Sequence, residues 1–209
     1  MSRFSDPGVE LGDFATHFAV HCPKCSGKAH IRPVGDHFPR YGNLQGVEWR
    51  LNCTACFHTE TNGRWYGAAT AFVSVKCREC HAPLERSTPW DGLWEKLALH
   101  CAACGDHCEY EAHITRHPYH EGQKTDPVLG LPLWLQKSFR EAVFWAYNYE
   151  HLDVLRRYIG AKLRERGITP RNTLRKNSAM LSRLPAFMTK AANRDSLLKL
   201  IAQLEQKAT

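Results

Sequence analysis

Four Cys-x-x-Cys pairs constrain this 209-residue sequence more than any other feature. At this spacing a β-hairpin turn presents two thiolates to one metal ion, and four sulfurs complete a tetrahedral zinc site. Such a site leaves no open coordination position, so the metal is expected to be structural. The sequence therefore predicts two structural Zn²⁺ ions per chain, with eight ligands: Cys22, Cys25, Cys53, Cys56, Cys77, Cys80, Cys101 and Cys104.

An internal repeat indicates which pairs share an ion. Residues 18–25 recur loosely as 72–80, and residues 49–56 recur as 97–104, because in each segment a short apolar or alternating run leads into the cysteines. The first pair should then join the second, and the third should join the fourth, with 27 and 20 residues between the pairs. Joining the second pair to the third is sterically possible, although it would split the two similar units.

The sequence around the first two pairs resembles a known family. Cys22-Pro-Lys-Cys25-Ser-Gly, followed by Cys53-Thr-Ala-Cys56, is similar to the transcription-factor-type zinc ribbon, and the resemblance covers residues 14–115 at most. It implies modules that bind nucleic acid, polymerase subunits or other proteins. From Leu131 onward, the chain resembles the C-terminal part of small uncharacterised bacterial zinc-ribbon proteins.

The hydrophobic pattern predicts an α+β fold with two tandem zinc ribbons of short antiparallel strands, followed by an α-helical C-terminal domain. Asn62-Gly63 between two strand-like runs is typical of a hairpin turn, so a third strand should complete the first ribbon. Prolines and glycines after the second ribbon are typical of a linker. The expected boundaries are 14–70 for ribbon 1, 71–117 for ribbon 2, 118–137 for the linker and 138–209 for a basic helical domain.

Helix signals define the expected C-terminal domain. Ser138 and Glu141 have the spacing of a capping box, which predicts that a helix begins there, and the apolar periodicity lets it run to Arg166. Further helices are expected around 180–184 and 197–204. We expect this domain to fold without help from the ribbons.

Cysteine usage bears on the cellular compartment. The N-terminus has no apolar stretch typical of a signal peptide, and no segment is long and apolar enough to span a bilayer. We therefore expect a cytoplasmic protein, in which nine cysteines favour metal thiolates over disulfides. Cys108, the ninth, is expected to be a buried or free thiol.

Basic residues are concentrated in the C-terminal part. Residues 131–209 hold 15 Lys/Arg and 6 Asp/Glu, whereas residues 1–130 hold 13 and 15. Zinc deepens this asymmetry, because four thiolates around one divalent ion leave about two negative charges per site. The excess is typical of phosphate binding, so six residues are candidate nucleic-acid contacts: Arg156, Arg157, Arg164, Arg171, Arg175 and Lys176.

These basic residues also have a simpler interpretation. Asp153 lies four residues before Arg157, so a solvated and internally paired helix face is the alternative to phosphate binding. Three histidines are expected to be exposed side chains and not a further metal site: His113, His117 and His120. Five aromatic residues could stack on unpaired bases or belong to the core: Trp49, Trp65, Tyr66, Trp90 and Trp94.

A second resemblance concerns catalysis. Asp36-His37, then Asn43, then the segment 53–58 are similar in order to HNH nucleases, whose zinc knuckles flank the active site. The resemblance implies His37 as general base, with Asn43 and His58 completing a site around a catalytic metal. The spacings depart from that family, and His58 lies in a strand-like run instead of a helix.

Other catalytic patterns are incomplete. His58-Thr-Glu60 followed by Cys77-Arg-Glu-Cys80 lacks the proline and the helices of a zinc deaminase. No phosphate-binding glycine loop, zinc-protease helix or serine nucleophile motif occurs. We therefore predict a non-catalytic zinc-dependent binding adaptor for DNA or RNA, with no membrane or small-molecule partner. The alternatives are an adaptor for an acidic protein partner and an HNH-like metal-dependent nuclease.

Overall fold

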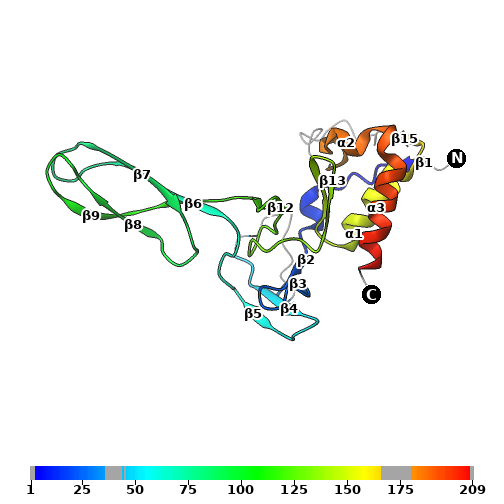
Figure 1. Ribbon diagram of the computed structural model, residues 1–209, viewed down its shortest axis with the longest axis horizontal. Coiled ribbons are helices and arrows are strands. Elements are labelled where there is room, and N and C mark those ends of the chain that lie inside the picture. Colours follow the sequence, from blue (N-terminus) through cyan, green and yellow to red (C-terminus); the bar gives the residue numbers. More distant parts are fainter. Residues whose placement is uncertain (1–2, 36–43, 45, 166–179, 208–209) are drawn as a thin grey trace. The chain divides into compact units, whose positions relative to one another are not determined.

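The computed structural model describes residues 3–35, 44, 46–165 and 180–207 (Figure 1). Its fold is α+β, as predicted, with several small and mostly antiparallel sheets and short helices. None of the helices in these residues is long and apolar enough to cross a membrane. Contacts divide the chain into two compact units: unit 1 is Met1–Asn62 with Leu133–Thr209, and unit 2 is Gly63–Pro132.

Unit 1 contains a four-stranded antiparallel sheet whose strands follow chain order. The strands are β2 (Phe18–His21), β3 (Lys28–Pro33), β4 (Trp49–Cys53) and β5 (Thr59–Thr61). Successive side chains of a strand point to opposite faces of the sheet. Ile31 and Leu51 lie opposite each other and are fully buried, whereas their neighbours Arg32 and Arg50 are exposed. One face of the sheet therefore belongs to the core, and the other is polar along β3 to β5, whereas at β2 Ala19 is buried on it.

The C-terminal part of unit 1 combines a hairpin with helices. The hairpin is β13 (Leu135–Phe139) with β14 (Ala142–Ala146), and the longer helices are α1 (Tyr149–Gly160) and α3 (Arg194–Gln206). The short elements are β1 (Arg3–Ser5), η1 (Leu11–Phe14), β15 (Leu163–Glu165), η2 (Met180–Arg183), α2 (Ala186–Thr189) and η3 (Ala191–Asn193). Helix α1 contacts α3, where Leu155, Ile159 and Ile201 are buried.

The prediction of a helix beginning at Ser138 is wrong. Ser138 lies in β13, and the chain turns at Arg140 and Glu141 into β14. Arg140 has a φ of 57°, a conformation found in two-residue turns between antiparallel strands. Phe144 of β14 is fully buried. Burial of Phe144 and Ala146 on one face of β14 thus outweighs the local capping-box spacing.

Helix α1 begins eleven residues later than predicted, after Asn148. The Asn148 side chain caps the helix, because its Oδ1 accepts a hydrogen bond of 2.9 Å from the His151 N–H. Its Nδ2 donates to the carbonyl of Phe14 at 2.8 Å and to that of His17 at 3.1 Å. One buried side chain therefore ties the N-terminal segment to the start of α1.

The other helices and the linker differ in detail from their expected boundaries. The last predicted helix lies within α3, and the short one before Pro185 appears as the 3₁₀ turn η2. Helix α1 ends at Gly160, and the predicted end at Arg166 lies outside the described residues. The segment expected to be a linker contains strand pairing, because β11 (Tyr119–His120), β12 (Gln123–Lys124) and the first residues of β13 fall within it.

Unit 2 consists mainly of two hairpins. Strand β6 (Ala69–Lys76) pairs with β7 (Pro83–Pro89) and with β10 (His113–Arg116), while β8 (Lys96–His100) pairs with β9 (His107–Glu111). A short ladder joins β11 (Tyr119–His120) to β12 (Gln123–Lys124). A small core from both hairpins holds the unit together: Val73, Leu97, Leu99 and Tyr110.

The hairpin predicted at Asn62-Gly63 is also wrong. Residues 63–68 form no strand, and the two compact units separate between Asn62 and Gly63. The Asn62 side chain instead accepts a hydrogen bond of 3.0 Å from the Trp49 N–H. Asn62 thus ends the sheet of unit 1 and does not turn the chain back onto it.

A buried aspartate closes a tight loop in unit 2. The Asp126 carboxylate accepts hydrogen bonds of 2.7–2.8 Å from the backbone N–H groups of Val128, Leu129 and Leu131. Burial raises the pKa of Asp126 to about 6, although the backbone donors act in the opposite direction. The loop also contains Gly130, whose φ is 74°. A Cβ there would lie 2.6 Å from the Gly67 backbone nitrogen.

We expect Gly130→Ala to destabilise unit 2 by about 3 kcal/mol, because the new methyl group meets backbone and the positive φ alone costs about 1–2 kcal/mol. Gly122 is the matched control, since it has the same φ of 74° but open space where its Cβ would be. Urea unfolding of both zinc-loaded variants measures the difference. Equal losses for Gly122→Ala and Gly130→Ala would show that the close approach to Gly67 contributes nothing.

Candidate metal centres

The first two cysteine pairs converge at one end of the sheet in unit 1. Cys22 and Cys25 lie in the turn between β2 and β3, whereas Cys53 ends β4 and Cys56 lies in the turn that leads to β5. The four Sγ atoms lie within 4.8 Å of one another. The Sγ–Sγ distance is 3.7 Å for Cys22 and Cys56, and 3.6 Å for Cys25 and Cys53. We name this group cluster 1.

The third and fourth pairs form cluster 2 in unit 2. Cys77 and Cys80 lie between β6 and β7, and Cys101 and Cys104 lie between β8 and β9. Their Sγ atoms also lie within 4.8 Å of one another, with 3.6 Å between Cys77 and Cys104 and 3.5 Å between Cys80 and Cys101. The predicted pairing of first with second and third with fourth is confirmed. The alternative, second with third, is wrong.

Each cluster fits one zinc ion. Sulfurs at about 2.3 Å from a tetrahedral zinc are about 3.8 Å apart, close to the distances in both clusters. A disulfide would need about 2.05 Å, and none of the nine cysteines forms one. The first cysteine of each pair is buried and the second is exposed. The chain therefore provides two four-sulfur sites at the tips of hairpins, as predicted.

All four turns share one backbone geometry. The N–H of the first cysteine donates to the carbonyl five residues later at 2.8–2.9 Å, and the acceptors are Gly27, His58, Ala82 and Asp106. Other N–H groups point at the sulfurs. Those of Lys24 and Gly27 lie 3.4 Å from the Sγ atoms of Cys22 and Cys25. The turn thus directs the positive ends of backbone N–H dipoles toward the sulfur atoms.

These donors favour the thiolate form. Burial raises the pKa of Cys53, but the N–H groups of Cys56 and Ala55 outweigh it and the pKa falls to about 6. In cluster 2 the N–H of Cys104 lowers the pKa of Cys101 to about 7, against the effect of burial. For Cys104 of the same cluster the N–H of Asp106 acts in the same direction, but burial and the sulfurs of Cys80 and Cys101 outweigh it and raise the pKa to about 12. Zinc binds thiolates and not thiols, so the backbone donors prepare one thiol of each cluster for the metal.

The residue after the second cysteine of each pair is left-handed, a feature that the sequence analysis did not identify. The φ angles are 58° at Ser26, 58° at Phe57, 60° at His81 and 79° at Gly105. Only Gly105 adopts this conformation without steric cost. The Phe57 side chain is 85% exposed, so packing offers it no compensation. The signal in the sequence is simply the position that follows each Cys-x-x-Cys.

We expect Phe57→Gly to stabilise zinc-loaded cluster 1 by about 1 kcal/mol, because glycine removes the strain of a positive φ. Zinc should then be lost about fivefold less readily to a competing chelator. The opposite change, Gly105→Ala in cluster 2, should favour zinc loss by a similar factor. Identical zinc retention in Phe57→Gly and the wild type would show that this turn carries no strain.

Two of the six predicted basic contacts lie on α1 and are paired with carboxylates. Arg157 Nε donates to Asp153 Oδ2 at 2.8 Å, and Arg156 donates to Asp153 Oδ1. Arg156 Nε also lies 3.3 Å from Glu205 Oε1. This is the internally paired helix face that the sequence offered as the alternative. The side chain of Arg164 lies outside the described part of the chain, as do Arg171, Arg175 and Lys176.

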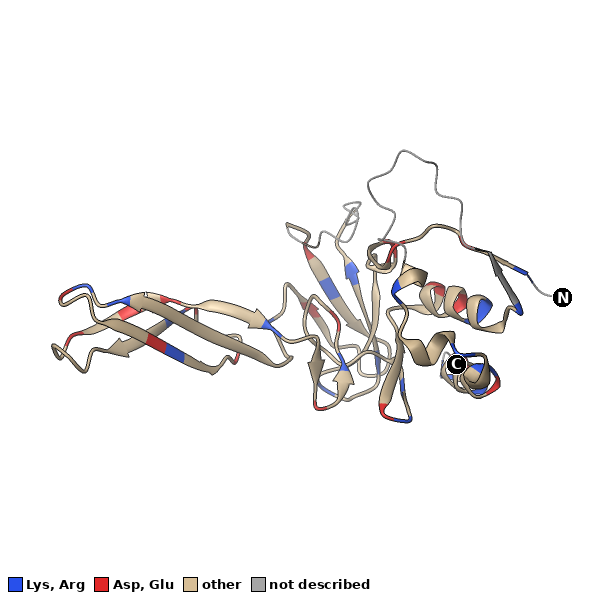
Figure 2. Ribbon diagram, turned by 90° about the horizontal axis from the view of Figure 1, so that it is seen from above, with Lys and Arg blue, Asp and Glu red and all other residues tan. Residues whose placement is uncertain are grey.

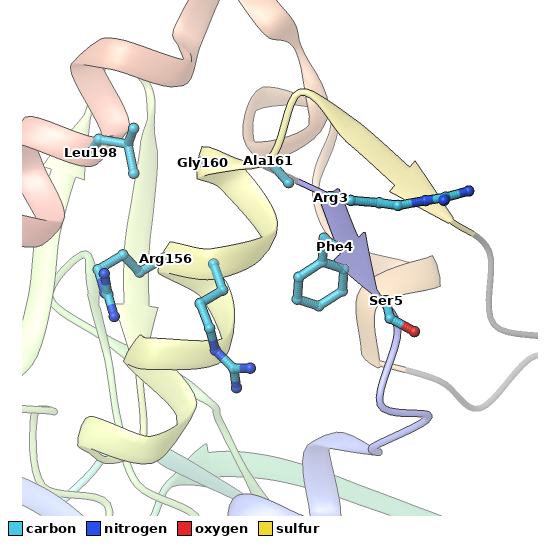
Figure 3. Close-up of a pocket in the computed structure, with 8 residues that line it drawn as sticks. Arg3, Phe4, Ser5, Arg156, Gly160, Ala161 and Leu198 are labelled. Atoms are coloured by element: carbon cyan, nitrogen blue, oxygen red, sulfur yellow. The ribbon is translucent and has the colours of Figure 1, made fainter. Parts of the chain in front are cut away.

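The α1 arginines line a shallow groove of about 510 Å³ formed by β1, α1 and α3 (Figure 3). Phe4, Ala161 and Leu198 contribute apolar surface to it. Exposed ion pairs are individually weak, but Asp153 and Glu205 together balance the charge of the two guanidinium groups. The charge of Arg156 and Arg157 is therefore largely balanced, while Arg3 also lines the groove.

The residues of the nuclease-like motif are only partly described. Asp36, His37 and Asn43 lie outside the described residues. His58 Nε2 lies 3.5 Å from Glu60 Oε2 beside β5, and neither joins a group of potential metal ligands. Cys77 and Cys80, the rest of the deaminase-like pattern, belong to cluster 2. That the chain is not an enzyme stays a prediction.

The other candidates have local roles. His117 Nε2 lies 2.8 Å from Thr70 Oγ1, and Cys108 is half-buried against the small core of unit 2. Trp49 and Trp65 are buried, as core residues would be. Within the described ranges, the two cysteine clusters are the only groups of three or more potential metal ligands.

Comparisons with known proteins found no matching family model, no matching curated protein and no matching solved structure. The likeness to zinc ribbons therefore rests on the two clusters and on the four equivalent turns that form them.

Proposed function

We propose that this chain is a non-catalytic, zinc-dependent binding protein whose partner is nucleic acid. The observation that supports the proposal is the division of charge between the two units. Unit 1 holds 21 Lys/Arg and 12 Asp/Glu, whereas unit 2 holds 7 and 9. Zinc bound by four thiolates removes about two charges from each unit and leaves unit 1 strongly positive. A unit with this excess attracts polyanions such as DNA and RNA.

The role of zinc in this proposal is to stabilise the two units. Four cysteine sulfurs complete the tetrahedral coordination of the ion, so no position is open for water or substrate. The surface of the chain, and not the metal, would then contact the partner. Of the predicted contacts, Arg164, Arg171, Arg175 and Lys176 remain candidates for phosphate binding, while the ion pairs of Arg156 and Arg157 reduce what those two contribute.

The test is a titration of the zinc-loaded full chain against fluorescently labelled single-stranded DNA, duplex DNA and RNA over a range of salt concentrations. We expect binding at low salt that weakens steeply as salt rises, because phosphate contacts release counterions. A chain that binds none of these at low salt, but captures an acidic polypeptide, would support the protein-partner alternative instead.

A separate measurement tests the absence of catalysis. We expect plasmid DNA and RNA to remain intact when incubated with the protein and Mg²⁺ or Mn²⁺, because the four-sulfur sites leave zinc no position for substrate. Cleavage that is abolished by His37→Ala would contradict the proposal and favour the nuclease-like alternative.

A further inference from the structure

The polar face of the four-stranded sheet carries a basic surface that the sequence analysis did not identify. Strand β3 places Lys28, His30 and Arg32 on this face, because the intervening Ala29 and Ile31 are fully buried. The register adds residues of the next two strands, since opposed residues share a face. We define the basic sheet face as Lys28, His30, Arg32, Arg50, Asn52, Thr59 and Thr61.

Two like charges lie directly opposite each other on this face. Arg32 of β3 pairs in register with Arg50 of β4. Figure 2 shows the basic positions of these neighbouring strands in blue. Like charges at directly opposed positions destabilise a sheet. Such a pair works against the stability of the fold, so a contact with an external anion is the simplest physical reason for it.

No acidic residue of β3, β4 or β5 lies on the basic sheet face, although Glu48, two residues before Arg50, continues the alternation on this side just outside β4. Glu60 of β5 lies opposite Leu51, on the other face, and is 3.5 Å from His58. Glu150, at the start of α1, is 3.4 Å from His17. The two arginines form no ion pair with any carboxylate among the described residues. Their charge is therefore not balanced by these neighbours.

Neutral groups hold the cations in place. Arg50 Nε donates to Thr61 Oγ1 at 3.2 Å, and Lys28 Nζ lies 5.0 Å from the centre of the Tyr149 ring. A hydroxyl orients the guanidinium of Arg50 without neutralising it. Burial lowers the pKa of His30 to about 4, and the charges of Lys28 and Arg32 add to this effect. Arg32 and Arg50 thus provide the positive charge at the centre of the face.

We propose that the basic sheet face binds the phosphodiester backbone of nucleic acid, with Arg32 and Arg50 as its central contacts. The inference deepens the proposed function and rests on it. Guanidinium groups offer several N–H donors each and suit phosphate oxygens geometrically. The threonine hydroxyls and the Asn52 amide beside them supply neutral donors of the kind that also contact phosphate. Because DNA and RNA share this backbone, the bases are not expected to decide the affinity.

The test compares two double variants of the zinc-loaded full chain that lose the same charge. Arg32→Gln/Arg50→Gln removes the central contacts, whereas Arg78→Gln/Arg86→Gln removes two exposed arginines from unit 2. We expect the first variant to bind single-stranded DNA and RNA at least about tenfold more weakly at moderate salt. Its log–log salt slope should fall by about 1.4 for single strands, which corresponds to two lost contacts. The unit 2 variant should bind like the wild type.

Thermal unfolding shows whether a loss of binding is due to misfolding. Removing a like-charge pair relieves repulsion, so Arg32→Gln/Arg50→Gln should unfold at the same or a higher temperature than the wild type. Weak binding with unchanged stability supports the site. If the wild type binds nucleic acid and this variant binds equally well, the site is wrong and the proposed function stands. If the wild type binds no nucleic acid at all, both are wrong.

Discussion

Cys22→Ser and Cys77→Ser should each leave the chain with one zinc ion instead of two, and each should unfold a different unit. A structural zinc site contributes about 10–16 kcal/mol, which is comparable to the whole stability of a typical domain, roughly 5–15 kcal/mol. Cys22→Ser should therefore unfold unit 1, including α1 and α3. Cys77→Ser should unfold unit 2 and leave those helices intact. Elemental analysis and circular dichroism measure both effects.

The difference between the two variants follows from the contacts of β2 in unit 1. The Phe18 ring lies edge-on to Tyr147 with 5.0 Å between ring centres, and the Ala19 N–H donates to the Tyr147 carbonyl at 2.8 Å. The sheet that carries cluster 1 thus shares a core with the segment leading into α1. This replaces the expectation, drawn from the sequence, that the helices fold without the first pair of cysteine turns.

Cys108→Ser serves as the control, because this cysteine lies outside both clusters and the variant should retain two zinc ions. A wild-type chain purified with one zinc ion or none would contradict the prediction. So would a Cys22→Ser variant that keeps the full helical signal of the wild type.

Asn148→Ala should lower the free energy of unfolding of unit 1 by about 3 kcal/mol. The side chain is buried and satisfies three backbone groups: the carbonyls of Phe14 and His17 and the N–H of His151. Truncation leaves these groups without their partner, and each loss costs about 1 kcal/mol or more. Urea unfolding of the zinc-loaded chain, followed by circular dichroism, measures the change.

Asn148→Asp separates the capping of α1 from the two hydrogen bonds that Asn148 donates to Phe14 and His17. Aspartate can still accept from the His151 N–H, but it cannot donate to the two carbonyls and places a negative charge against them. We expect it to be nearly as destabilising as Asn148→Ala. The exposed Asn52 provides a control, because Asn52→Ala should cost well under 1 kcal/mol. An Asn148→Asp variant as stable as the wild type would show that capping alone explains the role of this residue.

The metal ligands could be predicted from the sequence because they depend on local spacing. Cys22 and Cys25 are brought together by a single turn, and the recurrence of similar runs before each pair indicated which turns share an ion. The last helix was also recognisable, since Leu197, Leu200, Ile201 and Leu204 are spaced for one helix face and all four are buried. The left-handed residue after each pair belongs to the same turn, so the Cys-x-x-Cys spacing also indicates its position.

The capping-box spacing at Ser138 was misleading because it is a local signal, and burial within the folded chain outweighs it here. Capping energies are about 1 kcal/mol, whereas burial of a large side chain such as Phe144 contributes about 1.5–3 kcal/mol. When the two conflict, the contacts that bury Phe144 decide between strand and helix. These contacts join parts of the chain that no local pattern connects.

The sequence by itself determined that this chain has two four-cysteine sites, which cysteines form each of them, and that the fold is α+β. Only the tertiary structure decided that cluster 1 shares a compact unit with the C-terminal helices. It also decided that Arg32 lies opposite Arg50, and that the arginines of α1 are balanced by Asp153 and Glu205. The physical reason is range: a cysteine turn is specified by a few consecutive residues, whereas strand register and ion pairing depend on residues brought together by burial.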